Sequence, residues 1–198
     1  MLVSHTSKLM ITDVTTYYLE MTDADALRPK SHTHQGLSVS QVNLPSPELN
    51  RFLYTAVGGD WYWTERLEWT YQQWLEWVER SALQTWVAYI SGTPAGYCEL
   101  EGPADGNVEI VSFGLLPSFI GKGLGGYLLT VTIEKAWIMG ASRVWLHTCT
   151  LDHPTALANY LARGFRVYRE ETSTQELHDH PPGPWPGARH LPSITRTF

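Results

Sequence analysis

A glycine-rich turn between an apolar strand and a helix constrains this chain more than any other segment. Residues 108–116 have the β-branched and aromatic composition of a strand, residues 121–126 read Gly-Lys-Gly-Leu-Gly-Gly, and a largely apolar helix follows. Glycine lets the backbone approach a ligand closely, and the unpaired N–H groups at a helix start attract phosphate oxygens. Lys122 adds a positive charge there. The segment predicts a site for a ligand that carries a diphosphate.

The same glycines also fit the Gly-x-Gly-x-x-Gly spacing of dinucleotide-binding folds. In those folds the turn follows its strand directly, and an acidic residue ends the next strand about 20 positions further on. Here residues 116–120 lie between strand and turn, and the next strand ends at His147-Thr148-Cys149 without an acid. A nicotinamide-dependent dehydrogenase is therefore the less favoured alternative. Tight NAD binding without CoA binding would support it.

A second motif lies downstream of the glycine-rich turn. Residues 153–165 resemble Asn-x-x-Ala-x-x-Leu-Tyr-x-x-x-Gly-Phe, a pattern of the GNAT superfamily of N-acetyltransferases. The matching positions are Ala156, Tyr160, Gly164 and Phe165, while His153 replaces Asn and Asn159 replaces Leu. The glycine-rich turn resembles the acetyl-CoA-binding segment of the same family, (Gln/Arg)-x-x-Gly-x-(Gly/Ala). Gly123 and Gly125 take its two small positions and Ile120 departs at the first.

The resemblance implies an α/β (α+β) fold with a mixed, mostly antiparallel central sheet flanked by helices on both faces. We expect one GNAT-like domain over residues 1–198. Residues 1–82 would supply the acceptor-side helices and the first strand, residues 83–170 the acetyl-CoA-binding core, and residues 171–198 a C-terminal loop and the last strand. The length of 198 residues suits one such domain.

The resemblance also implies how acetyl-CoA would be held. Pantetheine would bond to the backbone at the end of the strand before the turn, where the Leu115 N–H would polarise the thioester carbonyl. The pyrophosphate would lie on the amides of the turn, assisted by Lys122. The expected acetyl-CoA-binding residues are Phe113, Gly114, Leu115, Leu116, Gly121, Lys122, Gly123, Leu124, Gly125, Gly126, His153 and Ala156.

Two residues are the leading catalytic candidates. Tyr160 occupies the position of the family's general acid, and a phenol with an ordinary pKa of about 10 suits protonation of a thiolate. Glu109 lies on the strand before the turn, where some members of the family carry a catalytic glutamate, and burial would raise the pKa of its carboxyl towards neutrality. Glu99 or Glu101, on the preceding strand, could reach the same cavity. His147 and Asp152 are weaker candidates for the base.

Five of the nine tryptophans lie between Trp61 and Trp77. At about 100° per residue their segment predicts one amphipathic helix, whose core stripe comprises Trp63, Leu67, Tyr71, Trp74, Leu75 and Val78. Tyr62 and Trp69 fall off that stripe, and large rings there are typical of a site. We expect Tyr62, Trp69 and Glu99 to bind the acceptor, and the acids Asp60, Glu65 and Glu68 to attract a cationic amine.

The composition excludes some classes of binding partner. The net charge of −6 and the lack of a basic cluster argue against nucleic acid. No apolar run has the length of a membrane span or signal peptide, and the two cysteines lie far apart, so we expect a cytoplasmic protein without a membrane partner. The pairs His32/His34 and His178/His180 are interpreted as solvated loop residues, and no metal is expected. The sequence is compatible with a homodimer.

Further elements follow from local patterns: a strand over residues 10–21, a helix over 46–57, a hairpin around 91–94, a strand over 165–170 and a last strand over 191–198. The favoured function is an acetyl-CoA-dependent N-acetyltransferase, in which a small-molecule amine attacks the thioester directly. A catalytically silent acyl-CoA-binding or interaction module of the same fold is the alternative.

Overall fold

The structure is a computed structural model that describes residues 8–102 and 105–185. Its strands are β1 (Leu9–Met21), β2 (Leu37–Gln41), β3 (Leu83–Ile90), β4 (Thr93–Glu101), β5 (Asn107–Leu115), β6 (Arg143–Cys149) and β7 (Arg166–His178). Its helices are α1 (Pro47–Gly58), α2 (Tyr71–Val78), α3 (Leu124–Ile138) and α4 (Ala156–Ala162), with short 3-10 turns at Ala24–Ala26 and Pro117–Phe119. The predicted strand over residues 191–198 lies outside the described residues.

One sheet organises these elements, in the order β2-β3-β4-β5-β6-β1-β7. All neighbouring strands are antiparallel except β5 and β6. The N-terminal strand β1 inserts between β6 and β7, so the first strand of the chain supports the last one described. The predicted mixed, mostly antiparallel sheet is confirmed. It is not the parallel sheet of a dinucleotide-binding fold.

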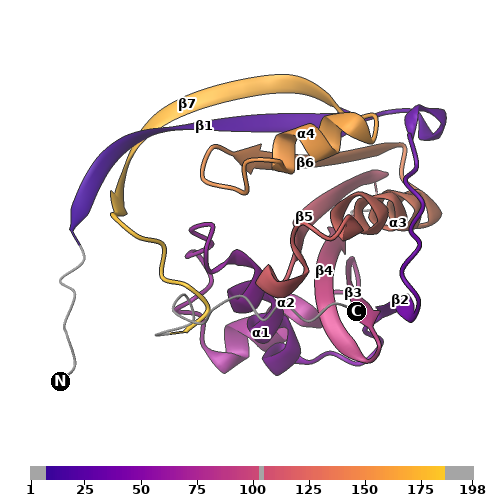
Figure 1. Cartoon of the computed structure of the whole chain (residues 1–198), viewed down its shortest axis with the longest axis horizontal. Helices are drawn as coiled ribbons and strands as arrows, with labels where there is room; N and C mark the ends of the chain where they lie inside the picture. Colours follow the sequence, from indigo (N-terminus) through magenta and orange to yellow (C-terminus); the bar gives the residue numbers. More distant parts are fainter. Residues whose placement is uncertain (1–7, 103–104, 186–198) are drawn as a thin grey trace.

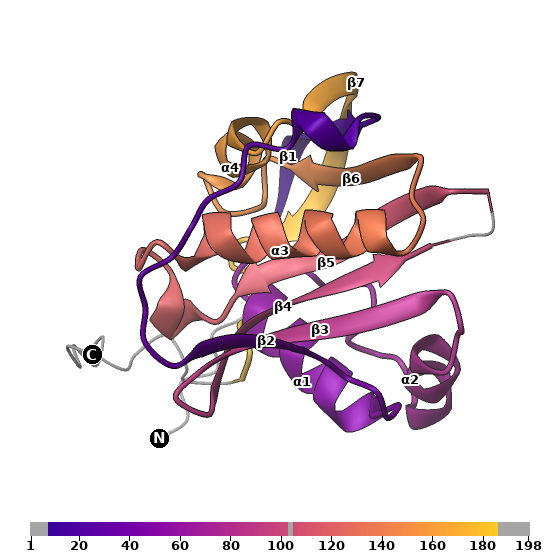
Figure 2. The ribbon, with the colours of Figure 1, turned by 90° about the vertical axis from the view of Figure 1, so that its right-hand side faces the viewer.

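Helices cover both faces of this sheet, as Figures 1 and 2 show. On one face Leu129 and Ile133 of α3 pack with buried residues of β1, β4, β5 and β6. On the other face Leu53 and Val57 of α1 pack on β3 and β4. Apolar side chains lie on nearly every side of α3. The sheet, α4 and the segment between β1 and β2 each cover part of this helix.

The strand β7 is longer than predicted. Sequence composition indicated a strand over residues 165–170 only, because the following residues are polar. In the structure β7 continues to His178 and pairs with β1 over the length of both strands. The two strands form a long ribbon that arches beyond the rest of the sheet (Figure 1). Pairing with β1 therefore decides the extent of β7.

The prediction of one helix through the tryptophan cluster was wrong. Residues 61–70 form turns, and α2 begins only at Tyr71. Thr70 and Gln73 form a capping box there: the Thr70 hydroxyl accepts from the Gln73 N–H, and the Gln73 side chain accepts from the Thr70 N–H. Only Trp74 of the short helix is fully buried, while Tyr71 is exposed. The strand over 10–21, the helix over 46–57 and the hairpin around 91–94 are confirmed within two residues.

Candidate active site

The strands β5 and β6 separate soon after they begin. They pair in parallel at only three positions, the last of which joins Glu109 to Trp145. Beyond that point a cavity of about 1060 Å³ lies between them. Its walls come from β1, β5, β6, the glycine-rich turn, α4, the end of β7 and the turns that hold the tryptophans. One continuous cavity thus connects the glycine-rich turn with the aromatic segment.

The glycine-rich turn is open towards this cavity. Gly121 and Gly123 adopt the left-handed conformation, with φ of 79° and 77°, and nothing lies within 4 Å of a Cβ placed on either. Gly123 precedes α3 and provides no side-chain cap, so the first amides of α3 have no capping side chain. Lys122 lies within the turn, its ammonium 5.6 Å from the centre of the Phe119 ring. Leu124 is buried in the core, so only its backbone is available to a ligand.

The register of β5 decides which backbone groups face the cavity. The Leu116 N–H donates to the Ala95 carbonyl at 2.9 Å, and hydrogen bonds alternate along an antiparallel pair. The N–H groups of Phe113 and Leu115 therefore point away from β4, towards the gap between β5 and β6. Phe113, Gly114 and Leu115 line the cavity. Leu116 does not line it, and its amide is already used.

Tyr160 lies on α4 against the wall of the cavity. Its ring is T-shaped to Phe113 and Phe165, with ring centres 6.0 and 6.2 Å apart. Burial raises the pKa of the phenol well above its ordinary value of 10, and the nearby Asp152 carboxylate adds to the shift. Tyr160 therefore keeps its proton across the neutral range, although the same rise in pKa makes it a weaker acid than an ordinary phenol.

Asp152 organises the turn between β6 and α4. Its carboxylate accepts hydrogen bonds from the Thr148 hydroxyl at 2.6 Å, the Cys149 N–H at 3.0 Å and the Trp63 indole at 3.3 Å. A carboxylate held by three donors is a structural anchor more than a base. His153 follows, with Nδ1 accepting from the Thr155 N–H, and its ring lies edge-on to Trp61. His153 and Ala156 both line the cavity.

Glu109 lies where β5 and β6 still pair, one residue before the cavity wall begins at Ile110. Its side chain is half-buried and faces Glu101, its register partner on β4. Desolvation, and then repulsion from Glu101, raise the pKa of the Glu109 carboxyl to about 7. Glu109 is thus poised to exchange a proton near neutral pH, but it does not itself line the cavity.

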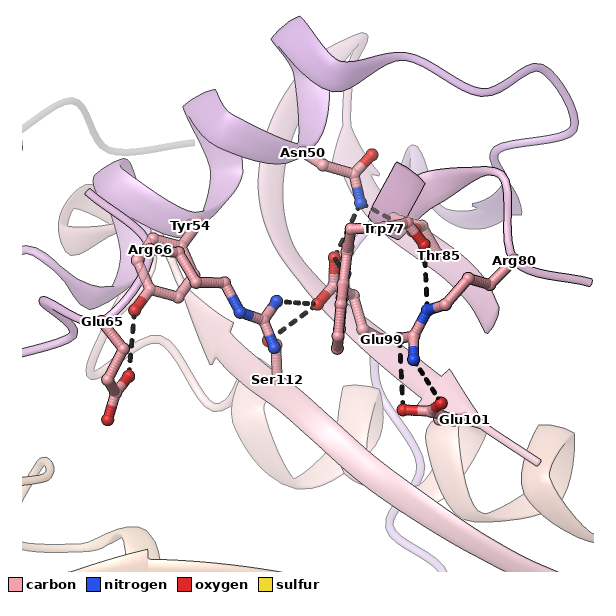
Figure 3. A network of polar contacts seen from close by, with 10 residues as sticks. All are labelled: Asn50, Tyr54, Glu65, Arg66, Trp77, Arg80, Thr85, Glu99, Glu101 and Ser112. Atoms are coloured by element: carbon pink, nitrogen blue, oxygen red, sulfur yellow. Dashed lines mark hydrogen bonds and ion pairs between the residues drawn. The ribbon is translucent and has the colours of Figure 1, made fainter. Parts of the chain in front are cut away.

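Glu99 is not free to bind an acceptor, contrary to our expectation. It is 1% exposed, does not line the cavity, and accepts four hydrogen bonds. The donors, drawn in Figure 3, are Asn50 (2.7 Å), Arg66 (3.1 Å), Trp77 (3.3 Å) and Ser112 (2.9 Å). These bonds join α1, α2, β5 and the turn before α2 to β4. The sequence could not reveal them, because the donors are distant from Glu99 along the chain.

The aromatic end of the cavity also differs from the expectation. Trp69 lines it, but the guanidinium of Arg66 lies 5.0 Å from the Trp69 ring centre and 3.7 Å from that of Trp77. A cation of the protein itself thus occupies this aromatic face. Tyr62 lines the cavity with φ of 59°, and its hydroxyl donates to the His178 carbonyl at 2.9 Å. Tyr62 therefore ties the end of β7 to the turn after α1.

Charged side chains divide the cavity into two ends. Lys30 and Arg163 lie beside the glycine-rich turn, whereas Glu65 and Asp152 lie among the aromatic rings. Arg66 also lines the aromatic end, but Glu99 neutralises it. Of the acids expected to attract an amine, Glu65 lines the cavity and receives a hydrogen bond from the Tyr54 hydroxyl, while Asp60 and Glu68 do not line it. Lys30, Arg163 and Arg66 carried no sequence signal, because isolated basic residues are usually solvated.

The first histidine pair is not a pair of solvated loop residues. His34 bonds through Nε2 to the Lys122 carbonyl at 2.8 Å, and the His32 ring packs on Tyr127 with 4.1 Å between ring centres. His34 therefore lies against the glycine-rich turn, and His32 lies against α3. Across the described ranges, no three side chains of the metal-ligating types gather into a cluster. No helix in those ranges has the length and apolar character to cross a membrane.

Comparison with known proteins agrees with this geometry. The profile of the acetyltransferase (GNAT) family matches residues 49–165. The chain therefore belongs to the GNAT acetyltransferase family. A search of curated proteins finds no match.

Solved structures show the same fold. A GCN5-related N-acetyltransferase from Sphaerobacter thermophilus superposes with a TM-score of 0.62 at 20% identity, over 84% of this chain and 53% of that one. One from Kribbella flavida gives 0.60 at 20% identity, over 84% and 59%. An aminoglycoside acetyltransferase from an uncultured soil metagenomic sample, in complex with sisomicin, gives 0.51 at 13% identity, over 65% and 86%. The chain thus spans just over half the length of the first two.

Proposed function

We propose that this protein transfers an acetyl group from acetyl-CoA to the amine of a small molecule. The observation that carries the proposal is the continuous cavity between β5 and β6, which has an open glycine-rich turn at one end and aromatic and acidic side chains at the other. A donor bound at the turn and an acceptor bound among the rings would meet between the separated strands.

The residues present fit the donor. The open, uncapped start of α3 suits a diphosphate, and the outward N–H groups of Phe113 and Leu115 suit the amides and carbonyl groups of pantetheine. Acetyl-CoA would supply an acetyl group activated as a thioester. The Leu115 N–H would polarise the thioester carbonyl, because a fixed donor stabilises the charge that develops on this oxygen.

Two side chains would move the protons. Attack by the amine forms the new C–N bond and breaks the C–S bond, so the thiolate must gain one proton and the amine must lose one. Tyr160, which stays protonated and lines the cavity, would give its proton to the thiolate. Glu109, with a pKa of about 7, would take the proton of the amine through a water molecule, because Glu109 lies just beyond the cavity wall.

The charge of the acceptor end supports an amine as the acceptor. Glu65 and Asp152 are carboxylates, Arg66 is neutralised, and Trp61, Tyr62 and Trp63 surround them. An amine is protonated near pH 7, and carboxylates beside aromatic rings favour a cation. One solved neighbour is described as an aminoglycoside acetyltransferase in complex with sisomicin.

The test is an acceptor screen that detects free thiol released from acetyl-CoA, run with a panel of cationic, neutral and carboxylate-bearing amines. We expect release with cationic amines, with mass spectrometry showing one acetyl group on the product. Saturable CoA binding without turnover across the panel would instead support the catalytically silent module, which the departures at Ile120 and His153 keep open.

A further inference from the structure

Two cationic side chains from outside the glycine-rich turn, Lys30 and Arg163, lie beside it. Lys30 and Arg163 come from opposite ends of the chain and meet at Gly126, in the first turn of α3. A Cβ placed on Gly126 would clash with Arg163 Nη1 and would lie 2.8 Å from Lys30 Cδ. The two side chains therefore lie next to each other and directly against the helix start. Any residue larger than glycine at position 126 would displace them.

Several contacts hold Lys30 in place. The segment of residues 24–36, which we call the strap, runs from the end of α4 past the start of α3 to β2 (Figure 2). Its backbone forms hydrogen bonds with both helices. At the end of α4 the Arg28 N–H donates to the Arg163 carbonyl at 3.0 Å, and on α3 the Lys30 N–H donates to the Thr130 hydroxyl at 2.9 Å. His34 adds its bond to the Lys122 carbonyl. The strap is thus fixed on the turn.

This arrangement favours a bound anion, with Lys30 exposed to solvent and Arg163 partly buried. Two positive side chains lie side by side at the partly positive end of a helix, and neither forms a salt bridge within the described part of the chain. Arg163 Nε is buried and has no hydrogen-bond partner among the described residues. Both side chains line the cavity. A bound anion would satisfy all of these groups together.

We propose that Lys30 and Arg163 form a clamp for the diphosphate of CoA. The proposal rests on acetyl-CoA being the donor. The clamp supplies, from the strap and the end of α4, the side-chain contacts that the turn lacks because Ile120 replaces Gln or Arg. The diphosphate is the group assigned because the clamp lies on the same helix start as the open amides of the turn.

The experiment measures affinity by calorimetry for CoA, dephospho-CoA and pantetheine, with Lys30→Met, Arg163→Met and the double variant. A charge-assisted contact is worth about 1.5 kcal/mol or more, so each single variant should bind CoA roughly tenfold more weakly. Dephospho-CoA should lose affinity equally, and pantetheine should lose none. Arg28→Gln, which removes an exposed charge from the same strap, is the matched control and should bind like the wild type.

Each other result overturns the clamp. A loss confined to CoA would assign the two cations to the 3′-phosphate, and an equal loss for pantetheine would mean that they only support the fold. Arg163→Lys, which keeps the charge, should retain most of the affinity, whereas a purely structural role for Arg163 would give no such rescue. Wild-type CoA binding without acetyl transfer would refute the proposed function and leave the clamp standing.

Discussion

At the scale of single residues, Glu109, the base that we propose, also carries a cost in stability. Its folded-state pKa of about 7 lies above the ordinary value of 4.5, because burial and Glu101 oppose its charge. Glu109→Gln should lower kcat/KM about 100-fold at pH 7 and remove the rise of the wild-type rate through that pH. At higher pH, where the amine is already neutral, the variant should recover. An unchanged pH profile would place the base elsewhere.

The same substitution should change stability in the opposite direction. When folding raises the pKa of a carboxyl, the free energy of unfolding falls as the pH rises from about 4.5 through 7. The reason is that the unfolded state loses its proton at a lower pH than the folded state. Glu109→Gln should therefore exceed the wild type in stability at pH 8, by on the order of 1 kcal/mol once solvent screening is allowed for. At pH 4 the two proteins should melt alike. Thermal unfolding at both values checks this, and a constant difference would exclude titration as its cause.

Tyr160 differs from Glu109 in its proposed role. Its hydroxyl would give a proton to the thiolate but would not contribute to the binding of acetyl-CoA. Tyr160→Phe should lower kcat by about 10- to 100-fold and leave the affinity for acetyl-CoA unchanged. The fold should tolerate the change, since the ring keeps its contacts with Phe113 and Phe165. Pre-steady-state thiol release and calorimetry separate the two effects. A loss of affinity as large as the loss of rate would assign the hydroxyl to binding.

Among residues, the sequence predicted those whose role depends on local motifs. The glycine-rich turn follows from its spacing and Tyr160 from the resemblance to the GNAT motif, and both line the cavity. Glu99 was misjudged because its partners come from distant segments. Trp69 was misjudged in part, since the periodicity that set it apart cannot show that Arg66 covers its ring. Long-range partners decide which polar groups are free.

At the scale of elements, the Glu99 network joins the helices of one face to the sheet (Figure 3). Removing one partner of a buried ion pair leaves an uncompensated charge, so Glu99→Ala should destabilise the fold by about 3–5 kcal/mol. Glu101→Ala is the matched control: Glu101 lies on the same strand and also pairs with an arginine, Arg80, but that pair is partly exposed. It should cost about 1 kcal/mol or less. Equal losses in urea unfolding would refute a special role for the buried network.

Elements were predictable where local signals start and stop them. Ser46 and Pro47 begin α1, and the capping box at Thr70 begins α2, although the aromatic periodicity extended the predicted helix back to residue 61. The aromatic periodicity was misleading, because rings spaced like a helical stripe also pack well from turns. For β7 the reverse holds: its polar half becomes a strand only because β1 lies beside it.

At the scale of the whole molecule, the sheet order could not be derived from the sequence. Nothing local indicates that β1 would separate β6 from β7, yet this placement brings Val14 and Thr16 of β1 and Gln175 of β7 to the cavity. The fold class was predictable because the two motifs identify it. The division of charge within the cavity was not, because Lys30, Glu65 and Arg163 come from three separate segments.

That division leads to a prediction about the acceptor. Glu65 is the carboxylate at the acceptor end with the fewest assigned donors, one bond from Tyr54 against three for Asp152. Glu65→Gln keeps the shape of the side chain and removes its charge. The KM for a cationic amine should rise about three- to tenfold, as expected for about 1 kcal/mol of attraction, with acetyl-CoA affinity unchanged.

The control for Glu65 is Glu68→Gln, which removes the same charge three residues away and outside the cavity wall. Its KM should stay within twofold of the wild type, and the Glu65 effect should shrink as salt is added, because ions screen the attraction of a partly exposed carboxylate. An equal rise for both variants would mean that the net negative charge of the protein, and not the site, attracts the amine. A rise with Glu65→Gln alone assigns acceptor recognition to the end of the cavity opposite the two cations.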